Sequence, residues 1–156
     1  MNSDVESAIQ NLASSGWRII KNDAGDSLPT QITERYPWIP KEVSDVLFNL
    51  REAVSPDETV WLLGGPDYSG TSDSSFAWNE WEQMSIEAAD GDQEWIARIT
   101  AFWNEHFPVA HSVGDGYAYF ALTPNGSVVT GREPEFEEPS PFAPGFTEFL
   151  LNLASV

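Results

Sequence analysis

Two tryptophans and two glutamates lie close together in the segment WNEWEQ, as Trp78, Glu80, Trp81 and Glu82. An indole ring can stack on a sugar, and paired carboxylates supply the acid and the base of glycoside hydrolysis. The tryptophans can instead be core or interface anchors, with the two acids as solvent-facing partners on a strand. Acidic residues are abundant in this chain, so the pairing is a weak signal and the structural interpretation is favoured. A glycan-binding or hydrolytic site is the alternative.

A second group of acidic residues crowds the segment GREPEFEEP, residues 131–139. Like charges at this spacing repel one another, so the segment is suited either to an external partner or to solvation alone. Its prolines lower the ordering cost of binding, and an aromatic ring among charges can act as an anchor or turn inward to close the core. The candidate partner-binding residues of this segment are Glu133, Glu135, Phe136, Glu137 and Glu138.

Three acids, Asp90, Asp92 and Glu94, occupy positions one, three and five of a calcium-loop pattern. The sixth position is Trp95, where the loop needs glycine, and the twelfth is Ala101, where it needs glutamate. An EF-hand is therefore excluded. The two aspartates are better explained as caps of a following helix. We expect neither a metal ion nor a cofactor.

The remaining titratable residues give no catalytic signature. His106 and His111 are five residues apart across an expected helix-to-strand junction, which favours separate structural roles over metal ligation. Asp115 lies between two glycines and is most simply a turn residue, although its carboxylate could join an acidic surface. The sequence contains no nucleophile elbow, glycine-rich phosphate loop or zincin motif. It therefore predicts a protein that is not an enzyme.

Charge is the strongest feature of the composition, with 7 basic and 25 acidic residues and a formal net charge of −18. Such a field repels nucleic acid and anionic membranes and attracts basic surfaces, so we expect a basic protein partner. It disfavours self-association, which favours a monomer, and it can also serve solubility alone. The sequence has no cysteine, secretory signal pattern or apolar run of bilayer length, so we expect a cytoplasmic protein.

The spacing of apolar residues predicts the helices that position these groups. A short helix is expected to begin after Ser3 or Asp4 and to end before Gly16. A second helix is expected from Pro40 to Ala53, because Val43, Val46, Leu47 and Leu50 share one face. Two more helices are expected at 93–106 and 145–154.

The strands are predicted from β-rich runs and from turn signals. A buried strand is expected at 59–63, before two glycines. Asp-Gly and Asn-Gly turns predict three antiparallel strands near 107–112, 117–122 and 127–131, followed by a loop that carries the acidic residues. Apolar residues at 76, 78, 84 and 86 alternate with polar ones and suggest two short strands there, whereas 17–33 is expected to be an irregular connection.

Together these elements predict an α+β fold in a single domain. A central antiparallel sheet, with a meander of strands near 107–131, is expected to pack against helices at both termini. Within that one compact domain, residues 1–33 would form an N-terminal helix and connection, and residues 34–156 the main α+β part. An apolar fraction of 41%, with seven tryptophans and nine phenylalanines, is enough to bury a substantial core.

From about residue 34 to 153 the chain resembles the SUKH superfamily, which includes fungal cell-wall synthesis regulators and bacterial immunity proteins against toxins. The resemblance lies in the segments YPWIPKEVSDVL, FAWNEWEQMS, FWNEHFPVAHSVGDGYAYFAL, GSVVTGREPEFEE and FTEFLLNL. It implies a binding module that inactivates a cognate toxin, often a nuclease or another enzyme, by covering its surface.

The sequence thus predicts a non-enzymatic, cytoplasmic immunity protein that neutralises a basic toxin by direct contact through an acidic surface. Charge complementarity of this kind speeds association, which matters for an inhibitor that must act before damage is done. Two alternatives stay open: a glycan-binding or hydrolytic domain built on the Trp78–Glu82 cluster, and a regulatory scaffold without a toxin partner.

Overall fold

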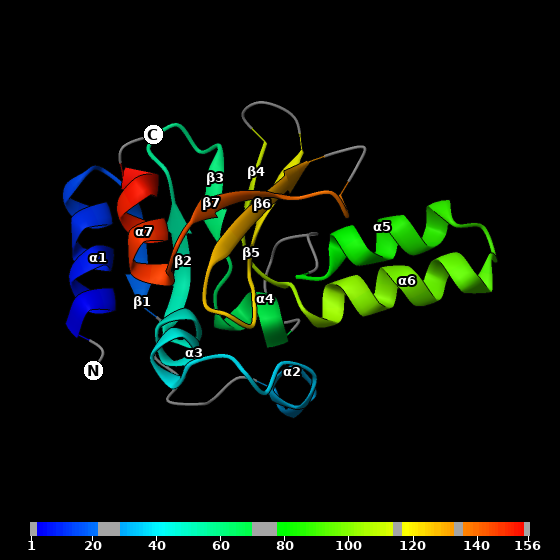
Figure 1. Ribbon diagram of the computed structural model, residues 1–156. Coiled ribbons are helices and arrows are strands. Elements are labelled where there is room, and N and C mark those ends of the chain that lie inside the picture. Colours follow the sequence, from blue (N-terminus) through cyan, green and yellow to red (C-terminus); the bar gives the residue numbers. More distant parts are fainter. Residues whose placement is uncertain (1–2, 22–28, 70–77, 114–116, 133–135, 155–156) are drawn as a thin grey trace.

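The computed structural model describes residues 3–21, 29–69, 78–113, 117–132 and 136–154. Its strands form one antiparallel sheet in which each strand pairs with the next along the chain, in the order β1 to β7 (Figure 1). Their bounds are β1 Arg18–Lys21, β2 Leu50–Val54, β3 Val60–Leu62, β4 Phe107–Ser112, β5 Ala118–Leu122, β6 Val128–Arg132 and β7 Ser140–Ala143. The predicted α+β fold is confirmed, as a seven-stranded meander in a single domain.

The helices lie around this sheet. Their bounds are α1 Ser3–Ser14, α2 Thr30–Arg35, α3 Lys41–Phe48, α4 Gly65–Ser69, α5 Glu80–Ala88, α6 Gln93–Asn104 and α7 Phe146–Ala154. The N-terminal and C-terminal helices α1 and α7 pack side by side at the end of the molecule that carries β1 and β2 (Figure 1). Helices α5 and α6 form a hairpin that projects from the opposite end, away from the sheet. No helix in the described part of the chain has both the length and the apolar character needed to cross a membrane.

The predicted three-stranded part of the meander is confirmed. Strand β5 pairs with β4 on one side and with β6 on the other, with Tyr119 opposite both His111 and Gly131. The turn between β5 and β6 contains Asn125 and Gly126, as its sequence predicts. Gly126 has a φ of +89°, and the Asn125 side chain accepts a hydrogen bond from the Ser127 amide at 3.0 Å.

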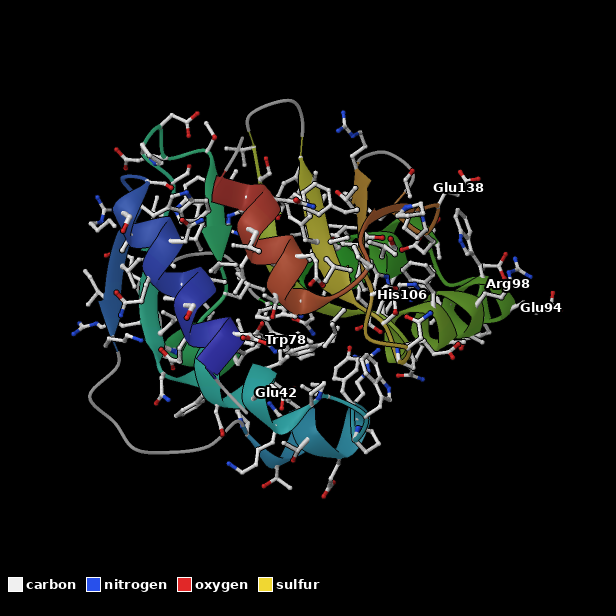
Figure 2. All side chains as sticks on the ribbon, turned by 60° about the vertical axis from the view of Figure 1, so that its left-hand side comes forward. Glu42, Trp78, Glu94, Arg98, His106 and Glu138 are labelled. Carbon is white, nitrogen blue, oxygen red and sulfur yellow. The ribbon has the colours of Figure 1, made fainter. Side chains whose placement is uncertain are left out.

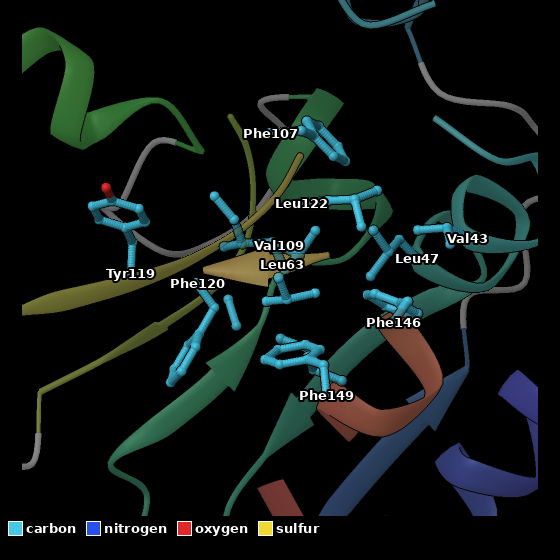
Figure 3. Close-up of a cluster of buried hydrophobic side chains, with 14 of the residues drawn as sticks. Val43, Leu47, Leu63, Phe107, Val109, Tyr119, Phe120, Leu122, Phe146 and Phe149 are labelled. Atoms are coloured by element: carbon cyan, nitrogen blue, oxygen red, sulfur yellow. The ribbon is translucent and has the colours of Figure 1, made fainter. Parts of the chain in front are cut away.

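The core lies on both faces of β5, and alternate residues of the strand face opposite layers. Figure 3 shows Phe120 and Tyr119 pointing to opposite sides of the strand. On one side the Phe120 ring packs against Phe149 of α7, with ring centroids 5.3 Å apart. On the other side Tyr119 packs against Trp103 of α6, with centroids 4.8 Å apart. Every residue of β5 is therefore buried.

The helix predicted from Pro40 to Ala53 is wrong over its second half. Helix α3 ends at Phe48, and Leu50 begins strand β2, which pairs with β1 and β3. The helical spacing is real in α3, where Val43, Val46 and Leu47 are buried. Leu50 continues that spacing but is buried as a strand residue instead, because pairing on both sides of β2 outweighs the local helical pattern.

Three further predictions need correction. The supposed irregular connection 17–33 contains β1 and α2, and β1 is an edge strand paired with β2. The supposed short strands around 78–86 are instead helix α5, while Phe76 lies outside the described residues. In α5 the buried positions are Trp81, Glu82 and Ser85, which share one helical face. The expected loop between the last predicted strand and the last helix also contains a strand, β7.

Candidate protein-binding surface

The α5–α6 hairpin is built around a tight turn. Asp90 and Gly91 both adopt the left-handed conformation, with φ values of +46° and +84°, which glycine and aspartate tolerate better than most residues. Of the two aspartates expected as caps, Asp92 caps α6 by accepting a hydrogen bond from the Trp95 amide at 3.1 Å, whereas Asp90 lies in the turn instead. The described residues contain no group of histidine and acidic side chains arranged to hold a metal ion.

Part of the acidic loop is fastened to the base of this hairpin; we call residues 136–138 the acidic segment. The Glu137 carboxylate accepts hydrogen bonds from Ser85 Oγ of α5 at 2.7 Å and from Trp103 Nε1 of α6 at 2.9 Å. The Phe136 side chain is 5% exposed, and the Phe136 carbonyl accepts a hydrogen bond from the Tyr119 hydroxyl. Of the two roles considered for Phe136, the structure places its ring in the core.

The other residues of the acidic loop divide into two groups. Glu138 is exposed and lies on the same side of the molecule as Glu94 and Arg98 of the hairpin (Figure 2). Glu133 and Glu135 lie outside the described residues, as does Asp115 of the earlier turn. The predicted acidic cluster is therefore not uniform, because the Glu137 carboxylate accepts two hydrogen bonds from the hairpin whereas the Glu138 side chain is largely exposed.

The Trp78–Glu82 cluster is not gathered at one open surface. The Trp81 side chain has no exposed area and packs against Tyr119, with ring centroids 5.6 Å apart. Trp78 is half-buried and contacts the rings of Tyr36 and Tyr68. Both tryptophans thus contribute to packing, and Trp81 presents no free ring face for stacking.

The two glutamates of that cluster lie in different environments. Glu80 is half-exposed in the first turn of α5. Glu82 is only 6% exposed and forms a bidentate ion pair with Arg35 of α2, with both nitrogen–oxygen distances at 2.8 Å. The interpretation of Glu82 as a solvent-facing strand residue is wrong, because its carboxylate bonds a cation 47 residues away in sequence.

Arg35 is a residue that sequence reasoning missed. Besides the pair with Glu82, its Nε donates a hydrogen bond to Asn104 of α6 at 2.7 Å, and its guanidinium lies 5.3 Å from the centroid of the Tyr36 ring. One side chain thereby joins α2 to both helices of the hairpin. No local pattern predicts the contacts with Glu82 and Asn104, since these residues are 47 and 69 positions away in sequence.

Ion pairs within the protein engage several of the basic residues in the described part of the chain. The described pairs with acids are Arg18–Glu52, Lys21–Glu6, Arg35–Glu82 and Lys41–Asp45. By contrast, Glu87, Asp90 and Glu94 of the hairpin are exposed, and none of them pairs with a cation in the described ranges. The outer part of the hairpin therefore keeps its negative charge, and attracts cations from outside the protein.

The two histidines occupy separate aromatic environments. His111 of β4 stacks on Trp61 of β3, with ring centroids 4.7 Å apart. His106 stacks on Phe102 at 3.8 Å, and its Nδ1 lies 2.7 Å from the Phe102 carbonyl oxygen. Burial lowers the pKa of His111 to about 4 and also lowers the pKa of His106 below its usual value.

We expect nuclear magnetic resonance titration to resolve these two environments, because the chain has only two imidazoles. The His111 ring should titrate with a midpoint near 4, well below the 6.5 of a free imidazole. Between those two values the unfolded chain binds a proton that the folded protein excludes, so His111 lowers stability as the pH falls through this window. The variant His111→Gln should lose that contribution. A His111 midpoint at or above 6.5 would contradict its buried stacking.

Comparison of the chain with protein-family models, with curated proteins and with solved structures gave no match.

Proposed function

We propose that this protein is a non-enzymatic binding domain: a cytoplasmic, monomeric immunity protein that neutralises a basic toxin by direct contact through an acidic surface. The resemblance to the SUKH superfamily supplies the class. The observation that carries the proposal is the attachment of the acidic segment to the α5–α6 hairpin by Glu137. The next residue, the exposed Glu138, lies on the same side of the molecule as Glu94 of the hairpin (Figure 2).

This arrangement suits an inhibitor of a basic enzyme for two reasons. A toxin that acts on nucleic acid is basic where it grips phosphate, and a protein with a net charge of −18 competes for that surface. The hairpin helices are also held in place by the Arg35–Glu82 pair and by the buried Trp81 and Trp103, so little ordering is needed on binding.

The first test is neutralisation in cells. The product of the neighbouring coding region should be toxic when expressed alone, and coexpression of this protein should restore growth. The purified pair should form a complex whose affinity falls steeply as salt is added. If the neighbouring gene product is toxic but this protein neither restores growth nor binds that product, the proposal is overturned and a regulatory scaffold is favoured.

A charge-neutralising variant then locates the contact. Replacing Glu87, Glu94 and Glu138 together by glutamine should weaken binding about 30-fold at low salt, because charges at an interface steer association and pair with the partner. The matched control replaces three exposed acids elsewhere, as Asp4→Asn, Glu34→Gln and Glu148→Gln. Both variants change the net charge equally, so equal losses of affinity would mean that only the overall charge matters and that this side is not the contact.

A further inference from the structure

The apolar stripe of α6 extends beyond the part of the helix that the rest of the molecule covers. Trp103 and Ile99, one turn apart, are 1% and 2% exposed. Trp95 continues the same stripe one turn closer to the turn of the hairpin, and there the side chain is 43% exposed. The core-facing stripe thus ends on a large aromatic residue that the described part of the protein leaves partly uncovered.

The surroundings of Trp95 are acidic. We define the hairpin tip as residues 87–98, which contain four acids and one base, Arg98, for a net charge of −3. Glu94 and Arg98 both lie at the outer end of the hairpin in Figure 2. Almost all of the tip is exposed, with Ala89 buried and Ile96 half-buried. A partly exposed indole within a tip of net negative charge is therefore the chief apolar feature of the described part of this surface.

The other exposed large apolar residues in the described part of the chain are aliphatic, namely Ile20, Val113 and Leu151. Leu151 is 42% exposed, close to the value for Trp95, but it belongs to α7, which lies at the end of the molecule opposite the hairpin (Figure 1). Single exposed aliphatic residues are ordinary on protein surfaces, whereas tryptophan is the residue type most enriched among the strongest contacts of interfaces. Leu151 therefore provides a matched control for any effect of exposed apolar area alone.

We propose that Trp95 is the apolar anchor through which the hairpin tip binds a basic protein surface, one in which lysines or arginines surround an aliphatic contact. The partner's class rests on the proposed function, and the surface itself is assigned here. Helix α6 holds the Trp95 backbone through the Asp92 cap, which keeps the ordering cost of binding low. A second copy of this chain is a poor occupant, because two tips of net charge −3 would repel each other.

The anchor can be tested without knowing the partner, by titrating two synthetic peptides. One has a central leucine between two runs of three lysines, and the other has glycine in place of that leucine. Wild-type protein should bind the leucine peptide about fivefold more tightly, since partial burial of one aliphatic side chain supplies a preference of that size. The preference should vanish in Trp95→Ala and persist in Trp95→Phe and in Leu151→Ala.

The readout also locates the binding. The chain has seven indole N–H resonances, and that of Trp95 is identified by its loss in Trp95→Ala. This resonance should shift most with the leucine peptide, and the same peptide with every lysine acetylated should leave it unmoved. A leucine preference that survives in Trp95→Ala, or shifts spread evenly over the indoles, would overturn the assignment.

Affinity measurements with the partner from the neutralisation assay distinguish a failure of the Trp95 anchor from a failure of the proposed function. If that partner binds wild-type protein, Trp95→Ala should weaken binding about 30-fold, the effect of a residue at the centre of an interface. Leu151→Ala should leave the affinity within about twofold of wild type. Unchanged affinity in Trp95→Ala would reject the anchor while the proposed function stands. Failure of the partner to bind wild type would reject the proposed function, and the peptide titration would still decide the anchor.

Discussion

Replacing Glu82 with alanine should lower the free energy of unfolding by about 2–4 kcal/mol, because it leaves the Arg35 guanidinium without its carboxylate in a partly buried position. The Arg35 side chain is 23% exposed, so water can reach it and the expected loss lies somewhat below that of a fully buried pair. The measurement is chemical denaturation of wild type and variant, followed by tryptophan emission.

Two comparisons isolate the cause of that loss. The double variant Arg35→Met with Glu82→Leu replaces both charges by apolar groups, and should be more stable than Glu82→Ala alone. The exposed pair between Arg18 and Glu52 has the same chemistry, at 3.0 Å, so Glu52→Ala should leave the melting temperature almost unchanged. If Glu82→Ala proved as mild as Glu52→Ala, the pair would not be what holds α2 to the hairpin.

The parts of the fold that sequence predicts well are those with strong local signals. Asn125-Gly126 forces a tight turn, and the strands on either side follow from it. Helix α6 is equally plain, since Ile99 and Trp103 repeat at helical spacing after the capping Asp92. In both places the local sequence alone indicates the structure that forms.

The errors arise where the same residues satisfy two periodicities. Leu50 fits the helical face of Val43, Val46 and Leu47, but it also fits a buried strand, and only the partner strands β1 and β3 decide between them. In the segment of α5, apolar residues alternate at first sight, whereas Trp81 and Ser85 are buried at helical spacing. Both decisions depend on residues far away in the chain, which no local pattern reports.

The candidate surface is only partly predictable for the same reason. Sequence identifies the acidic segment and its aromatic residue, but it does not distinguish Glu137, which bonds Ser85 and Trp103, from the exposed Glu138. Sequence places Trp95 in the helix expected at 93–106 and at the sixth position of the excluded calcium loop, but it does not reveal that the side chain is exposed. Its exposure follows from how far the hairpin projects from the sheet, and that is a tertiary property.

Gly131 in β6 is a position where one added methyl group should strongly lower the stability of the protein. Its φ lies outside the left-handed region, so the requirement for glycine is one of space. A Cβ there would lie 2.5–2.6 Å from the hydroxyl and ring atoms of Tyr119, its cross-strand partner. Tyr119 is fully buried and its ring packs against Trp81 and Trp103, so it has little room to move aside.

Gly131→Ala should therefore destabilise the protein by about 3 kcal/mol, the upper end of the usual cost of overpacking. A displaced Tyr119 ring would also lose the hydrogen bond from its hydroxyl to the Phe136 carbonyl. Since that bond holds the start of the acidic segment, amide hydrogen exchange at residues 136–138 should accelerate more than exchange in α7, which the Tyr119 ring does not face.

A double-mutant cycle distinguishes a steric clash from a general weakness of β6. Tyr119→Ala removes the ring, and in that background Gly131→Ala should cost less than about 1 kcal/mol, because the obstructing atoms are gone. The coupling between the two sites should then account for most of the loss seen in Gly131→Ala alone. If the stability losses of Gly131→Ala and Tyr119→Ala simply add, the alanine does not clash with the Tyr119 ring. The acidic segment is then held by Glu137 and its two hydrogen-bond donors instead.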